Sequence, residues 1–553
     1  MKKALRLLGK IMMTLFVVLL LCVAGTANYI RSIRVDKPDF APEFTDERLT
    51  YRLDTDSVRR IGNNYLKEVS PGLWQMYVEG SPFHRGEVMG ALTADLHAFQ
   101  EDAFIRQVHK MVPNDSYLRL LKYFVTFFNR HIQQYIPREN LEEIYGESLY
   151  MSSKYDNIIG SPYMRILNYH AAHDIGHALQ DRNFVAGCTS FAAWSNHSED
   201  GKVIVGRNFD FYVGDEFAKN KIVAFLKPDR GIPFAMITWP GMTGVVSGMN
   251  MEQITVTINA AKSDYPTEAK TPVSLVARNI LQYSRTIDEA IAIARRFEMF
   301  VSESFLVSSG KEGRAVIIEK SPEKMAVFTP DSSLLFCSNH FQSPIFHDDV
   351  NNADFKKNSS SGYRMQRLQQ LTSGLLINPF DAAAILRNPY GINGSHIGWG
   401  NEDALNQFIA HHGVIFKPAE YRMWVSTAPY QTGRMICFDL KDIFDGQKAG
   451  LHPTEDIAAD SALIKDAIVP YQRFKAIITS IKEKTGEVAY AEMEKAIRLN
   501  PDYYYGYEVA GDCYFRGGKK DEAADMYAKA LKRDIPNRKD RERIAGQLEA
   551  CKQ

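Results

Sequence analysis

Hydrophobic spacing divides the chain into blocks with different periods. Between residues 92 and 136, apolar side chains recur at intervals of three and four, which is the spacing of helices with one buried face. From residue 188 to about residue 440, short apolar runs of strand length dominate. These runs are residues 189–195, 203–211, 234–240, 253–261, 304–309, 314–320, 324–329 and 333–339. The sequence therefore predicts a helical first block followed by a sheet-rich block.

Two amphipathic segments, 273–284 and 286–300, separate the first four strand-like runs from the last four. The second segment opens on Thr286 with Glu289 three residues later, a pairing that caps helix N-termini. Strands and helices grouped in this way predict an α+β fold, in which two antiparallel sheets are layered with helices, rather than a parallel α/β fold. After a Gly- and Pro-bearing linker at 446–470, the pattern turns helical again.

Residues 1–27 have the pattern of an export signal. No charge occurs from Ile11 to Ala27, and Gly25 and Ala27 are small residues at which a signal peptidase can cut. The basic head before this stretch consists of Lys2, Lys3, Arg6 and Lys10. We favour a cleaved signal peptide, with an uncleaved membrane anchor as the main alternative; a lipoprotein site at Cys22 is disfavoured by the bulky residue before it. All three interpretations predict an exported, periplasmic or other extracytoplasmic protein.

The C-terminal residues 471–553 resemble a tetratricopeptide repeat. Ala496 precedes Ala530 by about 34 residues, the period of such repeats. Small and aromatic residues occupy the packing positions of a helix-turn-helix, namely Ala510, Gly511, Tyr514, Gly517, Ala523, Tyr527, Ala530 and Pro536. About two repeats do not form a free-standing superhelix. A helical cap on the preceding domain and a binding surface for a protein partner therefore both stay open.

Composition narrows the classes of function. The 553-residue chain has 66 Lys and Arg against 66 Asp and Glu, and 45 % of its residues are hydrophobic. These values fit a folded protein of several domains and argue against a disordered chain or a multi-span membrane protein. A neutral balance also argues against a nucleic-acid partner. Because no two of the six cysteines form a CxxC pair, a thiolate zinc site and a disulfide-dense scaffold are not expected.

One cysteine, Cys188, stands in a context that favours chemistry. The Asp-Gly pair at 200–201 is a strong turn signal between two strand-like runs, and folding about it brings residue 188 opposite roughly 210–213. Asp210 is then beside Cys188, and Arg207 lies about one pleat away. A cation lowers the pKa of a thiol and a carboxylate can hold a base, so these neighbours predict an activated nucleophile.

The motifs around Cys188 resemble those of a known family. Gly-Cys-Thr-Ser at 187–190, followed by Gly-Arg-Asn-Phe-Asp-Phe at 206–211, is similar to the N-terminal-nucleophile hydrolases, and specifically to the isopenicillin-N acyltransferase-like branch related to choloylglycine hydrolases. Further matches follow in the same order over roughly 80–440. They are Asn259 in a second sheet motif, Asn339 in Ser-Asn-His-Phe, and Arg367 in Ser-Gly-Tyr-Arg-Met-Gln-Arg, where Arg364 is a competing match.

The resemblance implies a proenzyme that cuts itself between Gly187 and Cys188. A helical pro-segment at 28–187 would precede a four-layer αββα sandwich at 188–445. Cleavage would free the α-amine of Cys188, whose reference pKa of about 7.7–8.0 suits a general base. Within the implied site, Asp210 orients this amine and Arg207 stabilises the thiolate. The oxyanion donor is Asn259 with a backbone amide, and Asn339 and Arg367 complete the set.

The implied reaction is acyl transfer from a small linear amide through a Cys188 thioester, without cofactor or metal. Water as acceptor gives an amidase and an amine gives an acyltransferase, and the sequence does not choose between them. The alternative function is a non-enzymatic exported scaffold that binds a protein through its tail.

A histidine cluster is the strongest competing signal. His170, His173 and His177 share one face of an expected helix, and the last two have the spacing of a metalloprotease pair. Asp174 stands where that motif needs a Glu, and Gly176 weakens the helix. We therefore expect a structural role near the junction of the pro-segment and leave metal binding as the alternative.

Overall fold

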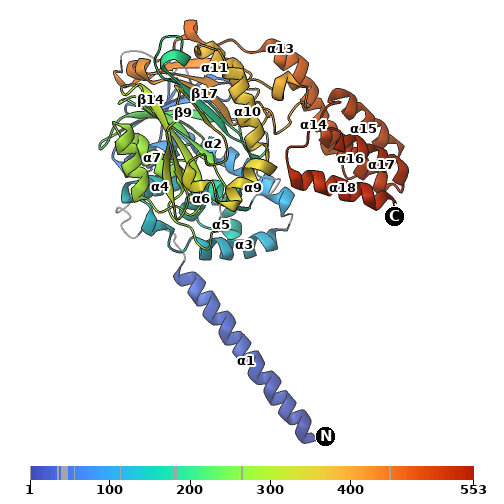
Figure 1. Ribbon diagram of the computed structural model, residues 1–553. Coiled ribbons are helices and arrows are strands. Elements are labelled where there is room, and N and C mark those ends of the chain that lie inside the picture. The colour runs from blue at the N-terminus through green and yellow to red at the C-terminus, as the bar shows by residue number, and fades with distance from the viewer. Residues whose placement is uncertain are drawn as a thin grey trace.

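The computed structural model describes residues 2–33, 37–38, 48–54, 57–112, 114–179, 185–262, 266–446 and 450–552. Figure 1 shows a body of sheets flanked by helices, a separate group of C-terminal helices, and one long N-terminal helix that projects away from the body.

The larger sheet has eleven strands in the order β1-β2-β3-β4-β9-β10-β11-β12-β13-β14-β15. Neighbouring strands run antiparallel except β4 and β9, which are parallel. The strands are β1 (Arg52–Leu53), β2 (Arg59–Ile61), β3 (Asn64–Ser70), β4 (Leu73–Gly80), β9 (Lys221–Pro228), β10 (Phe234–Thr238), β11 (Ser247–Asn250), β12 (Ile254–Ala260), β13 (Glu303–Ser309), β14 (Arg314–Lys320) and β15 (Met325–Phe328).

The smaller sheet has six antiparallel strands in the order β16-β6-β7-β17-β18-β19. They are β16 (Leu334–Cys337), β6 (Thr189–Ala193), β7 (Ile204–Phe209), β17 (His412–Lys417), β18 (Arg422–Ser426) and β19 (Met435–Asp439). A separate two-stranded sheet pairs β5 (Val185–Ala186), which precedes β6 in the chain, with β8 (Phe211–Tyr212), which follows β7.

The two sheets pack face to face over a shared apolar core. Val205 and Val414 of the smaller sheet and Phe225 and Ile317 of the larger one are fully buried in the same cluster. Fully burying such a side chain stabilises a fold by about 1.5–3 kcal/mol. The inner faces of the two sheets therefore hold the domain together.

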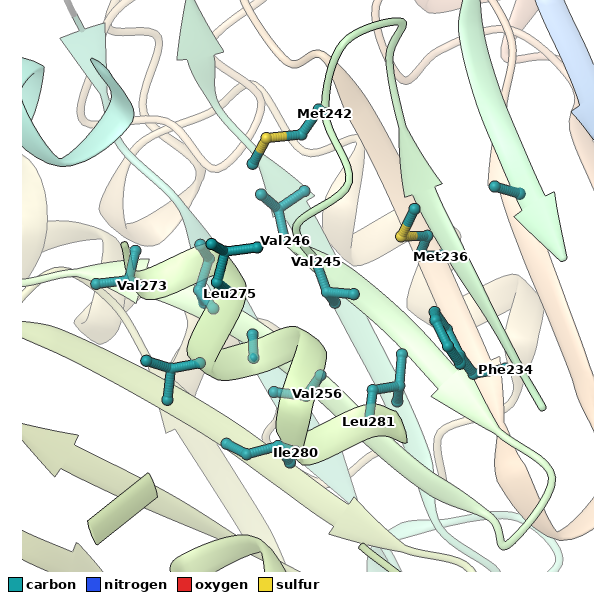
Figure 2. Packing of buried hydrophobic residues seen from close by; sticks show 14 of the residues in the cluster. Phe234, Met236, Met242, Val245, Val246, Val256, Val273, Leu275, Ile280 and Leu281 are labelled. Carbon is teal, nitrogen blue, oxygen red and sulfur yellow. The ribbon is translucent and has the colours of Figure 1, made fainter. Parts of the chain in front are cut away.

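Helices cover both outer faces. Figure 2 shows helix α7 (Val273–Tyr283) on the larger sheet, with Leu275, Ile280 and Leu281 packed against the β-strand side chains. Helices α2 (Pro82–Met111), α4 (Arg138–Ser148), α6 (Pro162–Leu179) and α8 (Ile287–Arg296) share this layer. Helices α10 (Ser360–Thr372) and α11 (Pro379–Leu386) cover the smaller sheet. The predicted α+β fold with four αββα layers is confirmed.

The N-terminal block differs from the prediction, because it is not helical throughout. Residues 52–80 form β1 to β4, and β4 pairs in parallel with β9 over eight positions, from Leu73 with Lys221 to Gly80 with Pro228. In β4 the side chains are buried almost continuously, so the strand shows no alternation of polar and apolar residues from which a half-buried strand could be predicted. The predicted pro-segment is therefore part of the larger sheet.

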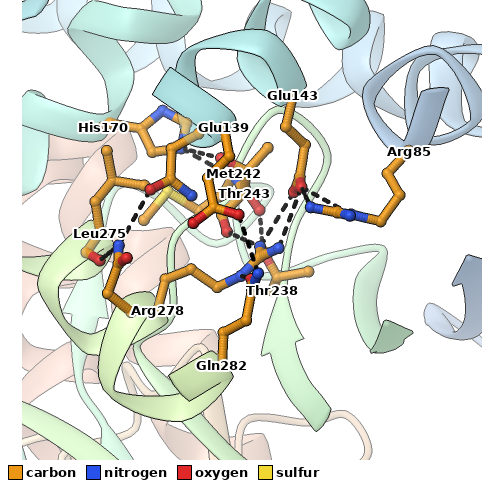
Figure 3. A network of polar contacts seen from close by, with 12 residues as sticks. Arg85, Glu139, Glu143, His170, Thr238, Met242, Thr243, Leu275, Arg278 and Gln282 are labelled. Carbon is orange, nitrogen blue, oxygen red and sulfur yellow. Dashed lines mark hydrogen bonds and ion pairs between the residues drawn. The ribbon is translucent and has the colours of Figure 1, made fainter. Parts of the chain in front are cut away.

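A buried ion network also ties this block to the sheet-rich part (Figure 3). Glu143 of α4 accepts from Arg85 of α2 at 2.6 Å and from Arg278 of α7 at 3.1 Å, and all three side chains are buried. Arg278 also donates to the Thr243 carbonyl at 2.7 Å. Removing one partner of such a network leaves an uncompensated buried charge, so the network fixes α2 and α4 against α7.

The C-terminal helices have their own apolar core, which includes residues of the preceding loop. They are α14 (Val469–Ile481), α15 (Glu487–Leu499), α16 (Tyr504–Arg516), α17 (Lys520–Leu531) and α18 (Arg538–Lys552). The loop residue Phe408 is buried in this core. Within the predicted linker, Leu451 and Ile457 make bridges to β19, so this segment borders the smaller sheet.

The remaining α-helices lie at the edges of these groups or between them. They are α3 (Asp115–Phe128), α5 (Asp156–Ile159), α9 (Val350–Asn358), α12 (Leu440–Phe444) and α13 (Ser461–Leu463). The N-terminal helix α1 (Lys2–Ser32) contains one segment, Met12–Ser32, that is long and apolar enough to cross a membrane by length and composition. A signal sequence passes the same test, so both interpretations of the N-terminus stay open.

Candidate active site

Cys188 lies immediately before β6, at the open end of a β-hairpin, opposite its turn. The hairpin between β6 and β7 is confirmed, with Thr189 opposite Asn208 and Ser190 opposite Arg207. Continuing this register places Cys188 opposite Phe209, one residue before the predicted range of 210–213. The thiol is buried, with 1 % of the residue exposed.

Arg207 contacts the thiol as the sequence predicts. Its Nη2 lies 3.6 Å from the Cys188 Sγ, and its guanidinium stacks over the Phe209 ring at 4.3 Å. The other donors bond to the carbonyls of Val246 and Ile258 and to the Ser247 hydroxyl. These contacts fix a buried cation at the sulfur.

Burial nevertheless controls the charge state of the thiol. It raises the pKa of Cys188 to about 11, although Arg207 acts to lower it. The sulfur is therefore a protonated thiol near neutral pH in the uncut chain. Activation needs a base that accepts its proton, in addition to the neighbouring cation.

The Asp210 carboxylate is positioned to hold such a base. The backbone carbonyl of Asp210 accepts from the Gly187 amide at 3.1 Å. Neither oxygen of the Asp210 carboxylate has a hydrogen-bond partner among the described residues. Burial raises the pKa of Asp210 to about 7, against the opposing effects of Arg364 and Arg207. An unpartnered buried carboxylate beside the start of β6 is chemically suited to receive a cationic donor.

Asn259 and Asn339 approach the hairpin from strands of different sheets. Asn259, on β12 of the larger sheet, accepts from the Ser190 hydroxyl at 2.8 Å and donates to the Cys337 carbonyl at 3.2 Å. Asn339 follows β16 and donates to the Ala260 carbonyl at 2.8 Å. Both side chains are buried, so the two sheets contribute to one polar site.

Arg364 reaches the polar site at Cys188, whereas Arg367, the residue that the sequence motif favoured, does not. Arg364 donates to the Cys188 carbonyl at 2.8 Å, to the Thr189 hydroxyl at 2.7 Å and to the Asn339 side chain at 2.6 Å. Arg367 instead faces Asn388 and Gln370. The two arginines are almost one turn apart on α10, and only the earlier one reaches the start of β6.

The structure adds two residues that sequence reasoning missed. Gln407 donates to the Gly187 carbonyl at 2.8 Å, and Glu303 is a fully buried carboxyl close enough to interact electrostatically with Cys188 and Arg207. Burial raises the pKa of Glu303 well above its usual range. Neither residue belongs to a short motif, so only their long-range contacts could reveal them.

Of the three clustered histidines, the structure describes the side chain of His170. His170 is buried and uses both ring nitrogens, because Nε2 accepts from the Thr243 amide at 3.1 Å and Nδ1 lies 2.9 Å from the Ile166 carbonyl. Asp174 accepts from the Val273 amide at 3.0 Å. His170 therefore has a structural role. The side chains of His173 and His177 lie outside the described residues.

One protein-family model matches part of the chain. Residues 196–428 match the model of the family described as acyl-coenzyme A:6-aminopenicillanic acid acyl-transferase. This match begins after Cys188 and includes the other four site residues, Arg207, Asp210, Asn259 and Asn339, as well as Arg364.

Two curated relatives match part of the chain. An uncharacterized protein of Archaeoglobus fulgidus is 27 % identical over 279 residues, which are 48 % of this chain and 46 % of the relative. The N-acylethanolamine-hydrolyzing acid amidase of Caenorhabditis elegans is 26 % identical over 226 residues, which are 39 % of this chain and 59 % of the relative. The chain thus spans about half the length of the curated relatives it matches.

A solved structure of the Caenorhabditis elegans N-acylethanolamine-hydrolyzing acid amidase ortholog is similar with a TM-score of 0.32 and 17 % identity, over 42 % of this chain and 93 % of that one. Residues 196–428 are thus similar to the family described as acyl-coenzyme A:6-aminopenicillanic acid acyl-transferase, which agrees with the resemblance of the motifs to the N-terminal-nucleophile hydrolases.

Proposed function

We propose that this protein is a self-processed cysteine amidase or acyltransferase that acts on linear amides through a Cys188 thioester. The observation that carries the proposal is the pairing of a cation and an unpartnered carboxylate around one buried thiol. Arg207 touches the sulfur, and Asp210 has no hydrogen-bond partner for its carboxylate among the described residues. An α-amine created at Cys188 would supply the partner that Asp210 lacks.

Self-cleavage starts with attack of the Cys188 sulfur on the Gly187 carbonyl carbon. The C–S bond forms while the thiol proton passes to the Cys188 nitrogen, and the C–N bond breaks to leave a thioester and a free α-amine. Water then hydrolyses the thioester, which leaves the Gly187 carboxylate and regenerates the thiol. The product is a chain that begins at Cys188.

In the mature site the α-amine is the general base. It accepts the thiol proton as the sulfur attacks the substrate amide, and it returns that proton to the departing amine. Arg207 stabilises the thiolate, Asp210 orients the amine, and Asn259 donates to the oxyanion. Asn339 acts through Arg364, which takes the place first expected for Arg367.

The uncut chain is a closed zymogen in this proposal. Cys188 is 1 % exposed, so substrate cannot reach the sulfur until the segment before it moves. We assign residues 28–187 to the pro-segment, 188–445 to the catalytic domain and 471–553 to the tail. Export through residues 1–27 belongs to the same proposal, with α1 as a signal or an anchor.

The two pieces remain associated after cleavage. Strand β4 of the pro-segment pairs with β9 of the catalytic domain. Glu143 of the pro-segment also forms an ion pair with Arg278 of the catalytic domain. Breaking this association would unpair a central strand and expose a buried ion network.

The names of two matches support a substrate class for this chain. The description of the matched family names acyl transfer to 6-aminopenicillanic acid, and the worm relative is named for hydrolysis of N-acylethanolamines. Both reactions make or break an amide between an acyl group and a small amine. For this chain we propose an N-acyl amide of the same general kind, with water or an amine as the acyl acceptor.

Intact-mass analysis of purified protein tests the proposal. Wild type should give two masses divided between Gly187 and Cys188, and Cys188→Ala should stay in one piece. A panel of N-acyl amides should then show amine release by wild type only. A thiol-directed electrophile should label Cys188 selectively in the cleaved protein.

An uncut wild-type protein would refute self-processing, and amide hydrolysis by that uncut protein would refute the role of the α-amine. Absent or uniform labelling of the cysteines would favour the alternative, a non-enzymatic scaffold.

A further inference from the structure

A buried glutamine contacts the bond that the proposed self-cleavage breaks. The Nε2 of Gln407 donates to the Gly187 carbonyl oxygen at 2.8 Å, and only 1 % of Gln407 is exposed. Its Oε1 has no hydrogen-bond partner among the described residues. The side chain therefore directs its amide donor to this carbonyl while leaving its own acceptor unsatisfied, which costs free energy in a buried site.

Gly187 is the residue type that this contact requires. A Cβ built on Gly187 would lie 2.5 Å from the Gln407 Nε2 and 2.8 Å from its Oε1. Both distances are shorter than ordinary Cβ contacts, so a larger residue at 187 would displace the Gln407 amide from its present position. The glycine before the nucleophile and the glutamine thus form one fitted pair.

The loop that carries Gln407 is held from both sides. The Asn406 side chain donates to the Arg387 carbonyl at 3.0 Å and accepts from the Phe408 amide at 3.2 Å. Phe408 has a left-handed φ of 54°, which is uncommon for a bulky residue, and its ring packs 5.4 Å from that of Tyr471 in α14. The C-terminal helices therefore brace the loop that places Gln407 at Gly187.

Asn259 makes no hydrogen bond to this carbonyl among the described residues of the uncut chain. Its amide nitrogen donates instead to the Cys337 carbonyl at 3.2 Å. Gln407 is the side chain that, among the described residues, donates to the Gly187 oxygen.

We propose that Gln407 is the oxyanion donor of self-cleavage, a catalytic residue of maturation distinct from the residues of substrate turnover. This inference rests on the proposed self-processing. When the Cys188 sulfur adds to the Gly187 carbon, the carbonyl oxygen becomes an oxyanion that keeps the hydrogen bond from Gln407. The thiol proton passes to the Cys188 nitrogen, the C–N bond breaks, and the carbonyl re-forms as a thioester. No further reactant is needed until water hydrolyses the thioester.

The test compares two buried glutamines. Gln407→Met keeps the length of the side chain and removes the donor, while Gln431→Met makes the same change at a glutamine that is also 1 % exposed but has no hydrogen-bond partner for its side chain among the described residues. Self-cleavage is followed by pulse-chase in cell-free translation, with wild type alongside. Loss of one oxyanion donor should slow cleavage about 10²–10³-fold in the Gln407 variant. The Gln431 variant should cleave at the wild-type rate.

A second measurement separates chemistry from folding. Both substitutions are placed in the uncleavable Cys188→Ala chain, and their melting temperatures are compared. The inference expects similar melting temperatures together with unequal cleavage rates. Equal slowing of both variants, or wild-type cleavage by Gln407→Met, would overturn it. If the wild-type chain itself stays uncut, the proposed function fails, and this inference fails with it.

Discussion

Replacing the Asp210 carboxyl by an amide in the uncut chain should change how its stability depends on pH. Burial raises the pKa of this carboxyl from 3.8 to about 7, so the folded chain favours its neutral form. Because the folded-state pKa lies above the unfolded value, the stabilising contribution is complete below about pH 4 and is lost as the pH rises through about 7. A shift of roughly three units corresponds to about 4 kcal/mol.

Urea unfolding of two uncleavable chains measures this effect. Cys188→Ala and the double variant Cys188→Ala, Asp210→Asn are compared at about pH 4 and about pH 8, where their other titrating groups are the same and cancel in the difference. The double variant should gain stability relative to its parent by up to about 4 kcal/mol between these conditions. If the unfolding free energies of the two chains change in parallel with pH, the Asp210 carboxylate is already solvated or paired. That result would refute the argument that this carboxylate has room for the α-amine as its partner.

Four further outcomes follow from the site and its supports. Arg364→Lys should lower the rate of amine release about 10-fold or more, because it loses the fork that spans Cys188 and Asn339, whereas the same change at Arg367 should leave the rate within about twofold; equal effects would contradict the assignment. Gly187→Ala should slow self-cleavage in pulse-chase, and a wild-type rate would show that the fit to the glutamine amide is dispensable. Arg278→Leu should lower the urea-unfolding free energy by about 3–5 kcal/mol, and a smaller loss than about 1 kcal/mol would show that the network is solvated. Intact-mass analysis of the protein recovered from membranes should show a chain without residues 1–27 if these residues are a signal peptide. The measured mass should include residues 1–27 if they are an anchor.

Much of the catalytic domain could be predicted from local sequence. The strand-like runs, the hairpin around Cys188 and the Thr286 cap depend on side-chain alternation, turn chemistry and capping, all of which act over a few residues. The Thr286 hydroxyl indeed accepts from the Glu289 amide at 3.1 Å. The order of the motifs also indicates that Arg207 and Asn259 belong to one site.

The fold of the first block was harder to predict. Strand β4 joins the larger sheet by pairing with β9, whose partner residues are about 150 positions later in the chain, and β1 to β3 follow β4 through local antiparallel pairs. A strand buried on both faces has no alternation, and its apolar run is as compatible with a helix as with a sheet.

The sequence by itself indicated two antiparallel sheets layered with helices, the candidate nucleophile Cys188 and the residue types around its sulfur, because these follow from side-chain periodicity and from motifs that resemble a known family. Only the tertiary structure decided that Arg364 reaches the site, that burial keeps the Cys188 thiol protonated, and that Gln407 meets Gly187. The last contact joins residues 220 positions apart. Such contacts, and the pKa shifts that burial causes, depend on which distant segments pack together, and no local pattern of side chains encodes that.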